Sequence, residues 1–143
     1  MSRVDFYVLS ESAPDAIWRC ACRLIEKAFD LDHRVYVYVA NAADAQRLDD
    51  MLWTFSDRSF IPHHTWAGED LPHELVKVLI GERPGPASHR DVLVNLSGTL
   101  PENIDTYARI AELVDTDAER KRLSRERYKQ YRERGCILET HNL

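Results

Sequence analysis

The chain has 143 residues, of which 44% are hydrophobic and 30% are charged, and its formal net charge is -5. This length and composition are typical of one globular domain, over residues 1–143, whose core needs no disulfide or metal. The acidic balance argues against a protein that binds nucleic acid over its whole surface, because neutralising phosphates requires positive charge.

Cysteine usage and the amino terminus both favour an intracellular protein. The three cysteines, Cys20, Cys22 and Cys136, are odd in number and irregularly spaced, so we expect reduced, partly buried thiols rather than a disulfide framework. The first residues lack the apolar stretch of a signal peptide, and no apolar run approaches about 18 residues. We therefore expect a cytoplasmic location and no membrane partner.

The first half of the chain alternates strand and helix patterns. Residues 4–9 are apolar strand formers, and residues 15–29 repeat apolar side chains at the three- and four-residue spacing of a helix. Residues 33–40 are apolar on both faces, which predicts a strand covered on both sides. Asn41 is a good N-cap for a helix that runs to about Trp53.

Short strands and loops dominate the next part of the chain. Residues 59–65 form a short apolar-polar stretch that could be a strand, and residues 75–80 and 91–96 are also expected to be strands. The segment 81–90 between them is rich in proline and glycine, which predicts a loop.

The last part of the chain contains one ambiguous segment and one strong helix. Residues 102–115 fit either a helix or a strand, and the sequence leaves both open. Residues 117–134 predict a helix that ends at Gly135. Residues 136–138 predict a short strand or a tail contact.

The alternation of strands and helices in the first half of the chain implies right-handed parallel crossovers. We therefore predict an α/β three-layer sandwich, with a mainly parallel, Rossmann-like sheet and helices on both faces.

The sequence lacks the motifs that would make such a sheet a nucleotide-binding enzyme. The first strand leads into Ser-Glu-Ser-Ala-Pro-Asp rather than a glycine-rich turn, so backbone amides have no close approach to a pyrophosphate. The loop with Gly81 and Gly85 lacks the lysine of a phosphate-binding loop, and no serine lies in a Gly-x-Ser-x-Gly turn. We expect no catalysis and no cofactor. A nucleotide-dependent enzyme is a less favoured alternative.

A metal site is also not expected. His63, His64, His73 and Glu74 are the metal-like cluster of the sequence. Adjacent histidines on an extended segment point to opposite sides, and His73-Glu74 has no histidine four residues further on. Surface histidines without a metal are the favoured interpretation.

The predicted helix 117–134 separates charge sharply from the rest of the chain. It has eight basic and four acidic side chains, so its net charge is +4 and the remainder carries -9. At 100° per residue, one face of about 100° collects Lys121, Arg125, Tyr128, Lys129 and Arg132. A separate face, with Leu123, Arg127 and Tyr131, is expected to pack inward while Arg127 snorkels to solvent.

Three interpretations of this basic face stay open. Cations around an aromatic ring suit an acidic ligand with an apolar or aromatic end, and they also suit single-stranded nucleic acid. A solvated helix with pairs such as Arg122–Glu126 is the third. The acidic remainder of the chain favours a peptide over nucleic acid.

A second notable segment, 53–66, contains large rings that either fill the core or form a partner surface: Trp53, Phe55, Phe60 and Trp66.

Several segments together resemble one known family over almost the whole chain. They are Asp5-Phe-Tyr-Val-Leu, Gln46-Arg-Leu-Asp-Asp-Met-Leu-Trp53, Ser59-Phe-Ile-Pro-His63 with Ala67-Gly-Glu, Arg90-Asp-Val-Leu-Val-Asn-Leu96, and Leu123-Ser-Arg-Glu-Arg-Tyr-Lys-Gln-Tyr-Arg132. In this order they resemble the chi-subunit family of DNA polymerase III. The resemblance implies a non-catalytic accessory subunit of the replication machinery.

The resemblance also implies two partners and the residues that meet them. One is the acidic C-terminal tail of single-stranded DNA-binding protein, which ends in Asp-Phe and a free carboxylate. Arg125 would hold that carboxylate, Lys121 and Lys129 the acids upstream, and Val114 and Tyr128 would line the pocket for the terminal phenylalanine.

The other implied partner is the psi subunit of the clamp loader, as a heterodimer. Trp53 and Phe60 match positions that the family uses against psi or rival partners, and Pro62 would shape the same segment. The chain would then bridge psi and the tail during DNA replication, and would meet nucleic acid only indirectly. The alternative is a single-stranded nucleic-acid-binding module that uses the basic C-terminal helix.

Overall fold

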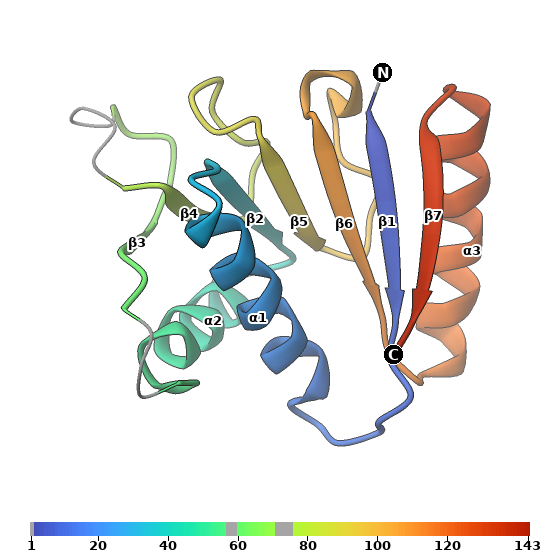
Figure 1. The fold of residues 1–143 in the computed structure, drawn as a ribbon, viewed down its shortest axis with the longest axis horizontal. Coiled ribbons are helices and arrows are strands. Elements are labelled where there is room, and N and C mark those ends of the chain that lie inside the picture. Colours follow the sequence, from blue (N-terminus) through green and yellow to red (C-terminus); the bar gives the residue numbers. More distant parts are fainter. Residues whose placement is uncertain (1, 57–59, 71–75) are drawn as a thin grey trace.

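A computed structural model describes residues 2–56, 60–70 and 76–143 as a parallel sheet with helices on both faces (Figure 1). The sheet has seven strands in the order β3-β4-β2-β5-β6-β1-β7, and every neighbouring pair is parallel. The predicted three-layer, Rossmann-like sandwich is confirmed. In chain order the elements are β1 (Arg3–Val8), α1 (Ala16–Asp30), β2 (Val35–Val39), α2 (Ala42–Thr54), β3 (His63–Thr65), β4 (Val78–Gly81), β5 (Val92–Leu96), a 3-10 turn (Ile104–Thr106), β6 (Arg109–Val114), α3 (Ala118–Glu133) and β7 (Ile137–Asn142).

Helices α1 and α2 cover one face of the sheet. The apolar residues of α1 recur at helical spacing, so Trp18, Cys22 and Ile25 are buried against the central strands. The predicted cap of α2 is confirmed, because the Asn41 side chain accepts a hydrogen bond of 2.8 Å from the Asp44 backbone N–H. Leu48 and the other apolar residues of α2 complete this layer of the core.

Helix α3 covers part of the opposite face, over β6 and β7. Asp117 caps its first turn, accepting a hydrogen bond of 2.9 Å from the Arg120 backbone N–H. Gly135 follows the helix with φ of 81°, as expected for a C-terminal cap. Loops cover the remainder of this face. Gly85 lies so close to Tyr36 that a Cβ there would come within 2.7 Å of the ring, so the tight loop requires glycine.

Two parts of the sequence interpretation are resolved by the sheet. In the ambiguous segment 102–115, a short 3-10 turn precedes β6, so a helix through Tyr107–Ala111 is wrong. Strand β6 lies between β5 and β1, and the ladders on both sides satisfy its backbone polar groups. The chain after Gly135 forms a strand of six residues along the full length of β1, longer than the short strand expected.

The strand expected over residues 59–65 is shorter, since β3 covers only three of its residues and residue 59 lies outside the described ones.

All three cysteines have free thiols, with Cys20 and Cys22 buried, and burial raises the pKa of Cys22 to about 12. In the described parts of the chain, no helix combines the length and apolar character needed to cross a membrane.

Candidate functional site

A pocket opens between α3 and the carboxyl-terminal halves of three strands. We call it the α3 pocket. It has a volume of about 260 Å³. Its lining comes from β1 (Phe6, Val8), β6 (Val114), α3 (Lys121, Ser124, Arg125, Tyr128) and β7 (Thr140).

The floor of the α3 pocket is apolar. Phe6 and Val114 are buried side chains of the sheet, and Val8 is half-buried beside them. The half-buried ring of Tyr128 lies 5.2 Å from the ring of Phe6, tilted by 56°. Aromatic rings favour such tilted contacts, so a further ring inserted here would meet apolar walls and ring faces.

The cations beside the α3 pocket differ from the other cations of the same helix. Arg122 pairs with Glu119 and Glu126, and Arg127 pairs with Glu112. The pair between Arg122 and Glu126 is the one that the solvated-helix interpretation predicted. Among the described residues, no ion pair involves the helix cations Lys121, Arg125, Lys129 and Arg132. These four cations lie on the predicted basic face, and their charge is available to an anion.

Four of the five residues predicted for the tail site line this one pocket: Val114, Lys121, Arg125 and Tyr128. The fifth, Lys129, is exposed on the same helix but does not line the pocket. Sequence reasoning missed Phe6, Val8, Ser124 and Thr140. The signal for the first two was present, because residues two apart on a strand face the same side. Thr140 could not be found without knowing that β7 lies beside β1.

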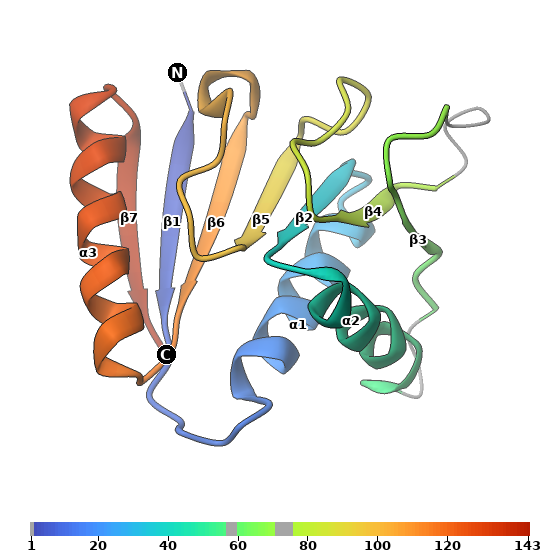
Figure 2. The same cartoon turned by 180° about the vertical axis from the view of Figure 1, so that it is seen from behind.

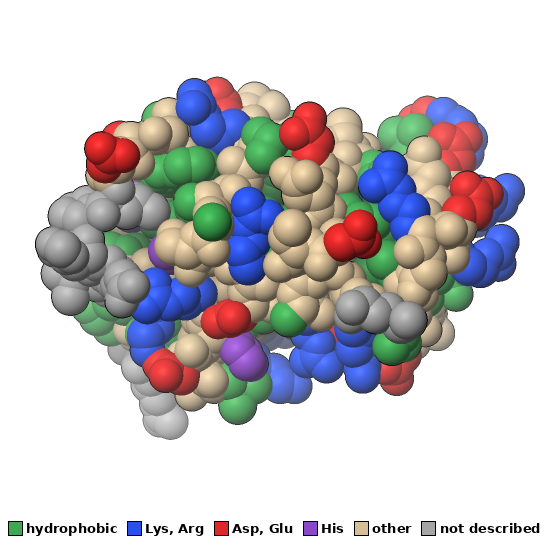
Figure 3. All heavy atoms as spheres, turned by 90° about the horizontal axis from the view of Figure 1, so that it is seen from above, with side chains coloured by type: hydrophobic (Ala, Val, Ile, Leu, Met, Phe, Trp, Pro, Cys, Tyr) green, Lys and Arg blue, Asp and Glu red, His purple; other side chains and the backbone are tan. Residues whose placement is uncertain are grey.

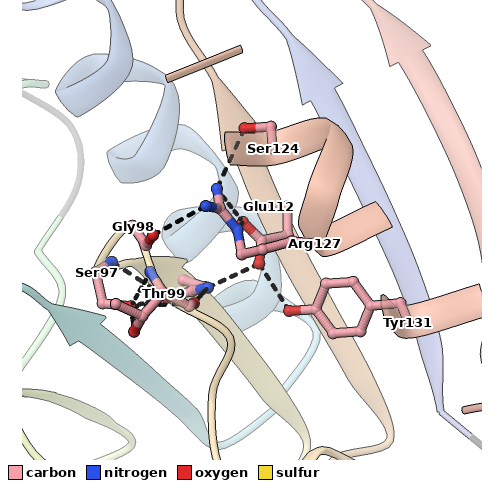
Figure 4. A network of polar contacts seen from close by, with 8 residues as sticks. Ser97, Gly98, Thr99, Glu112, Ser124, Arg127 and Tyr131 are labelled. Atoms are coloured by element: carbon pink, nitrogen blue, oxygen red, sulfur yellow. Dashed lines mark hydrogen bonds and ion pairs between the residues drawn. The ribbon is translucent and has the colours of Figure 1, made fainter. Parts of the chain in front are cut away.

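A buried polar network fixes α3 to the sheet (Figure 4). Arg127 Nε donates to the Glu112 carboxylate at 3.2 Å, and its Nη1 donates to the Gly98 carbonyl at 3.0 Å. The Tyr131 hydroxyl donates to Glu112 at 2.7 Å, and the Asn95 amide donates to it at 2.7 Å. The network therefore joins α3, β5 and β6 around a single carboxylate.

The snorkelling expected for Arg127 is wrong. Its side chain turns inward because Glu112 offers a buried carboxylate, and the residue is only 8% exposed. Inward packing of Tyr131 is confirmed, whereas Leu123 is only half-buried. Burial raises the pKa of the fully buried Glu112 carboxyl, against the opposing effect of Arg127 and of the hydrogen bonds from Tyr131 and Asn95.

A second candidate surface lies at the other edge of the sheet. Trp53, at the end of α2, is 48% exposed, and Phe60 is 72% exposed. Their ring centroids are 5.6 Å apart, and the Trp53 ring lies 4.2 Å from the His63 ring. Pro62 is half-buried between Phe60 and β3 in the chain. We call Trp53, Phe60, Pro62 and His63 the aromatic surface.

The four rings of segment 53–66 therefore divide between the two interpretations. Phe55 packs against the core beside α2, and Trp66 packs edge-on against Tyr36 at 6.0 Å. Trp53 and Phe60 do not fill the core, and exposed neighbouring rings are typical of a partner surface.

His63 and His64, the two described members of the histidine cluster, have separate hydrogen-bond partners. The buried His63 ring has Nδ1 2.6 Å from the Ile61 carbonyl and Nε2 3.1 Å from the Asp49 carboxylate. His64 is exposed and lies 2.9 Å from Glu69, so the two rings do point apart. His73 and Glu74 lie outside the described residues.

One other group has metal-type ligands within the described part of the chain: Asp5, Glu139 and His141. Arg3 and Arg109 also form ion pairs with the Asp5 carboxylate, at 3.2 and 3.4 Å. The positive charges of Arg3 and Arg109 beside this carboxylate disfavour binding of a metal ion there. The cluster is therefore best described as ion pairing between neighbouring strands.

The α3 pocket and the aromatic surface lie far apart along the sheet. β7 is one edge of the sheet and β3 is the other. Figure 2 shows α3 and β7 at one end of the molecule and α2 and β3 at the other. The two surfaces therefore lie at opposite ends of the molecule.

Comparisons with known proteins show the family of the chain. The family described as DNA polymerase III chi subunit, HolC, matches residues 1–139. Curated proteins named DNA polymerase III subunit chi are similar over nearly their whole length. The Pseudomonas aeruginosa protein is 40% identical over 143 residues, covering 100% of this chain and 98% of that protein. The Haemophilus influenzae protein is 30% identical, over 97% of this chain and 96% of that protein. The Escherichia coli protein is 27% identical, over 98% of this chain and 97% of that protein. The chain therefore belongs to the family of DNA polymerase III chi subunits.

Proposed function

We propose that this chain is a non-catalytic, cytoplasmic adaptor of DNA polymerase III, which joins the psi subunit to the acidic tail of single-stranded DNA-binding protein during replication. The observation that carries the proposal is the α3 pocket, an apolar cavity beside cations that have no carboxylate partner within the described residues. A peptide with upstream acids, a terminal aromatic ring and a free carboxylate matches both properties.

In this proposal the terminal phenylalanine ring enters the pocket against Phe6, Val114 and Tyr128. Arg125 holds the terminal carboxylate, because its planar guanidinium can donate two parallel hydrogen bonds to one carboxylate. Lys121 attracts acids upstream of the phenylalanine as a point charge, and Lys129, outside the pocket, extends the same positive face.

The aromatic surface supports the psi part of the proposal. Exposed rings in contact with each other, such as Trp53 and Phe60, can bury a large apolar area at little cost in conformational entropy. Its position at the opposite edge from the α3 pocket is what an adaptor with two simultaneous partners requires.

Calorimetry with a synthetic tail peptide tests the proposal. Wild type should bind a peptide that ends in Asp-Phe, and removing that phenylalanine should abolish binding, since the apolar pocket then stays empty. Arg125→Ala should weaken binding about tenfold or more, as expected for a charge-assisted hydrogen bond. Arg122→Ala is the matched control, because Arg122 is paired with acids of its own helix. Equal affinity for both peptides would contradict the proposal.

A single-stranded nucleic-acid-binding module is the second candidate function. The same unpaired cations beside Tyr128 favour it, since phosphates and a stacked base are an alternative ligand for such a face. Electrophoretic mobility shift with bare single-stranded DNA separates the two functions. The adaptor should show negligible binding at physiological salt, and tight binding there would favour the nucleic-acid module.

A further inference from the structure

Within the described residues, the edge strand β7 leaves backbone hydrogen-bonding groups free beside the α3 pocket. β7 pairs with β1 on one side only. The Ile137 N–H donates to the Ser2 carbonyl at 3.0 Å, and the Leu143 N–H donates to the Val8 carbonyl at 2.9 Å. In a strand, successive residues direct these groups to alternate sides, so the odd-numbered residues face β1. The residues whose N–H and C=O point away from the sheet are Leu138, Thr140 and Asn142.

This edge has few of the features that block strand addition. The register between β7 and β1 is continuous over six residues, without a bulge, and β7 contains no proline. Thr140 is exposed, and its side chain lines the α3 pocket while its backbone lies in the middle of the open edge. The pocket and the edge therefore form one continuous surface.

The topology fixes the direction in which a bound peptide would run. α3 follows the carboxyl end of β6 and returns the chain to the amino end of β7, so it runs antiparallel to both strands. The α3 pocket lies towards the carboxyl ends, near Val8 and Val114. A peptide with its last residue in the pocket and its upstream residues beside β7 would lie parallel to β7.

A row of cations accompanies this path. At 100° per residue, Lys121, Arg125 and Arg132 fall within about 40° of one another on α3. Tyr128, which contacts Phe6 of β1, adjoins this row, whereas Arg127 on the other side of the helix reaches β6. The row is therefore turned toward the β7 edge. Figures 1 and 2 show α3 alongside β7, and Figure 3 shows Lys and Arg side chains, among acidic ones, at that end of the molecule.

We propose that the acidic residues upstream of the terminal phenylalanine add to β7 as a further parallel strand, with the phenylalanine in the α3 pocket. This inference rests on the proposed function and names the backbone edge as part of the same site. Main-chain hydrogen bonds along the edge supply affinity, while the row of cations selects acidic side chains.

Strand addition has a signature that side-chain binding lacks. In an added strand, every second peptide N–H bonds to the edge, and the intervening ones point to solvent. N-methylation of a bonded N–H should weaken binding about two- to tenfold, the effect of one lost hydrogen bond, whereas N-methylation of its neighbour should have no effect.

The experiment uses the full chain and synthetic peptides ending in Asp-Phe, each N-methylated at one upstream position. Each peptide is the matched control for its neighbour, because charge and side chains are identical. Affinities that alternate with position would support the inference. Uniform affinities with intact peptide binding would overturn it and leave the proposed function standing, whereas no binding of any peptide would overturn both.

Amide hydrogen exchange measured by NMR tests the protein side without a mutation. The unmodified peptide should slow exchange of the outward Thr140 N–H by tenfold or more. The Glu139 N–H is the internal control, since it already faces β1 and should change little. Bound peptide with unchanged Thr140 exchange would contradict strand addition.

Discussion

At the scale of single residues, Asp5 connects three strands of the sheet. Its buried carboxylate on β1 lies 2.9 Å from His141 Nε2 on β7 and forms ion pairs with Arg3 and with Arg109 of β6. Burial by itself raises the pKa of Asp5. The hydrogen bonds from His141 and Arg3 and the charges of Arg3 and Arg109 outweigh this effect, so the pKa lies below its ordinary value.

The lowered pKa of Asp5 predicts acid sensitivity. A carboxyl whose pKa is lower in the folded state contributes stability above its unfolded pKa of about 3.9, and that contribution is lost as pH falls through the folded pKa. Asp5→Asn should therefore lower the free energy of unfolding by about 1–3 kcal/mol at pH 7. Urea denaturation at pH 7 and pH 3 should show this difference shrinking at pH 3. An equal difference at both values would contradict the assignment.

At the scale of elements, α3 is held on the sheet by the ion pair between Arg127 and Glu112. Removing one partner of a buried pair leaves an uncompensated charge, so Arg127→Met should destabilise the protein by about 3–5 kcal/mol. The double variant Arg127→Met with Glu112→Gln removes both charges and should recover part of the loss. Thermal or urea unfolding measures both, and a double variant less stable than the single one would contradict this account.

The elements differ in how far the sequence determines them. The strands and helices of the first half could be predicted because the period of their apolar residues changes clearly between two and three to four. β6 could not, since residues such as Ile110 and Leu113 are apolar enough for either structure, and only its position between β5 and β1 decides. β7 is mostly polar, so its strand comes from pairing with β1 rather than from its own residues.

The candidate site was predictable where it lies on one element. The basic face of α3 follows from helical spacing alone, and it supplies Lys121, Arg125 and Tyr128 to the pocket. The opposite wall depends on which strands lie beneath α3, which spacing along the chain does not contain. Arg127 was misjudged for the same reason, because its partner Glu112 is 15 residues earlier in a segment of ambiguous structure.

At the scale of the whole molecule, the two candidate surfaces should act independently, because they lie at opposite edges of the sheet. Trp53→Ala should weaken psi pairing about 30-fold, as expected for an aromatic residue at the centre of an interface, and leave tail-peptide affinity within about twofold. Calorimetry with psi and with the peptide measures the two effects separately.

Leu31→Ala is the matched control for Trp53→Ala. Leu31 is an exposed apolar residue, 59% accessible, that lies just after α1 and outside both surfaces. Its removal should change neither affinity. A Trp53 variant that pairs normally with psi would contradict the assignment of the aromatic surface.

The order of the strands has a mechanical consequence for an adaptor. Two partners that pull on opposite edges of the sheet would apply force perpendicular to the strands. Each hydrogen-bonded ladder between neighbouring strands would then have to carry that force. The ladder between β3 and β4 has only three register pairs. Trp53, however, is carried by α2, which packs on β2, β3 and β4. Tension that enters through Trp53 is therefore distributed by α2 over three strands and does not rest on the shortest ladder alone.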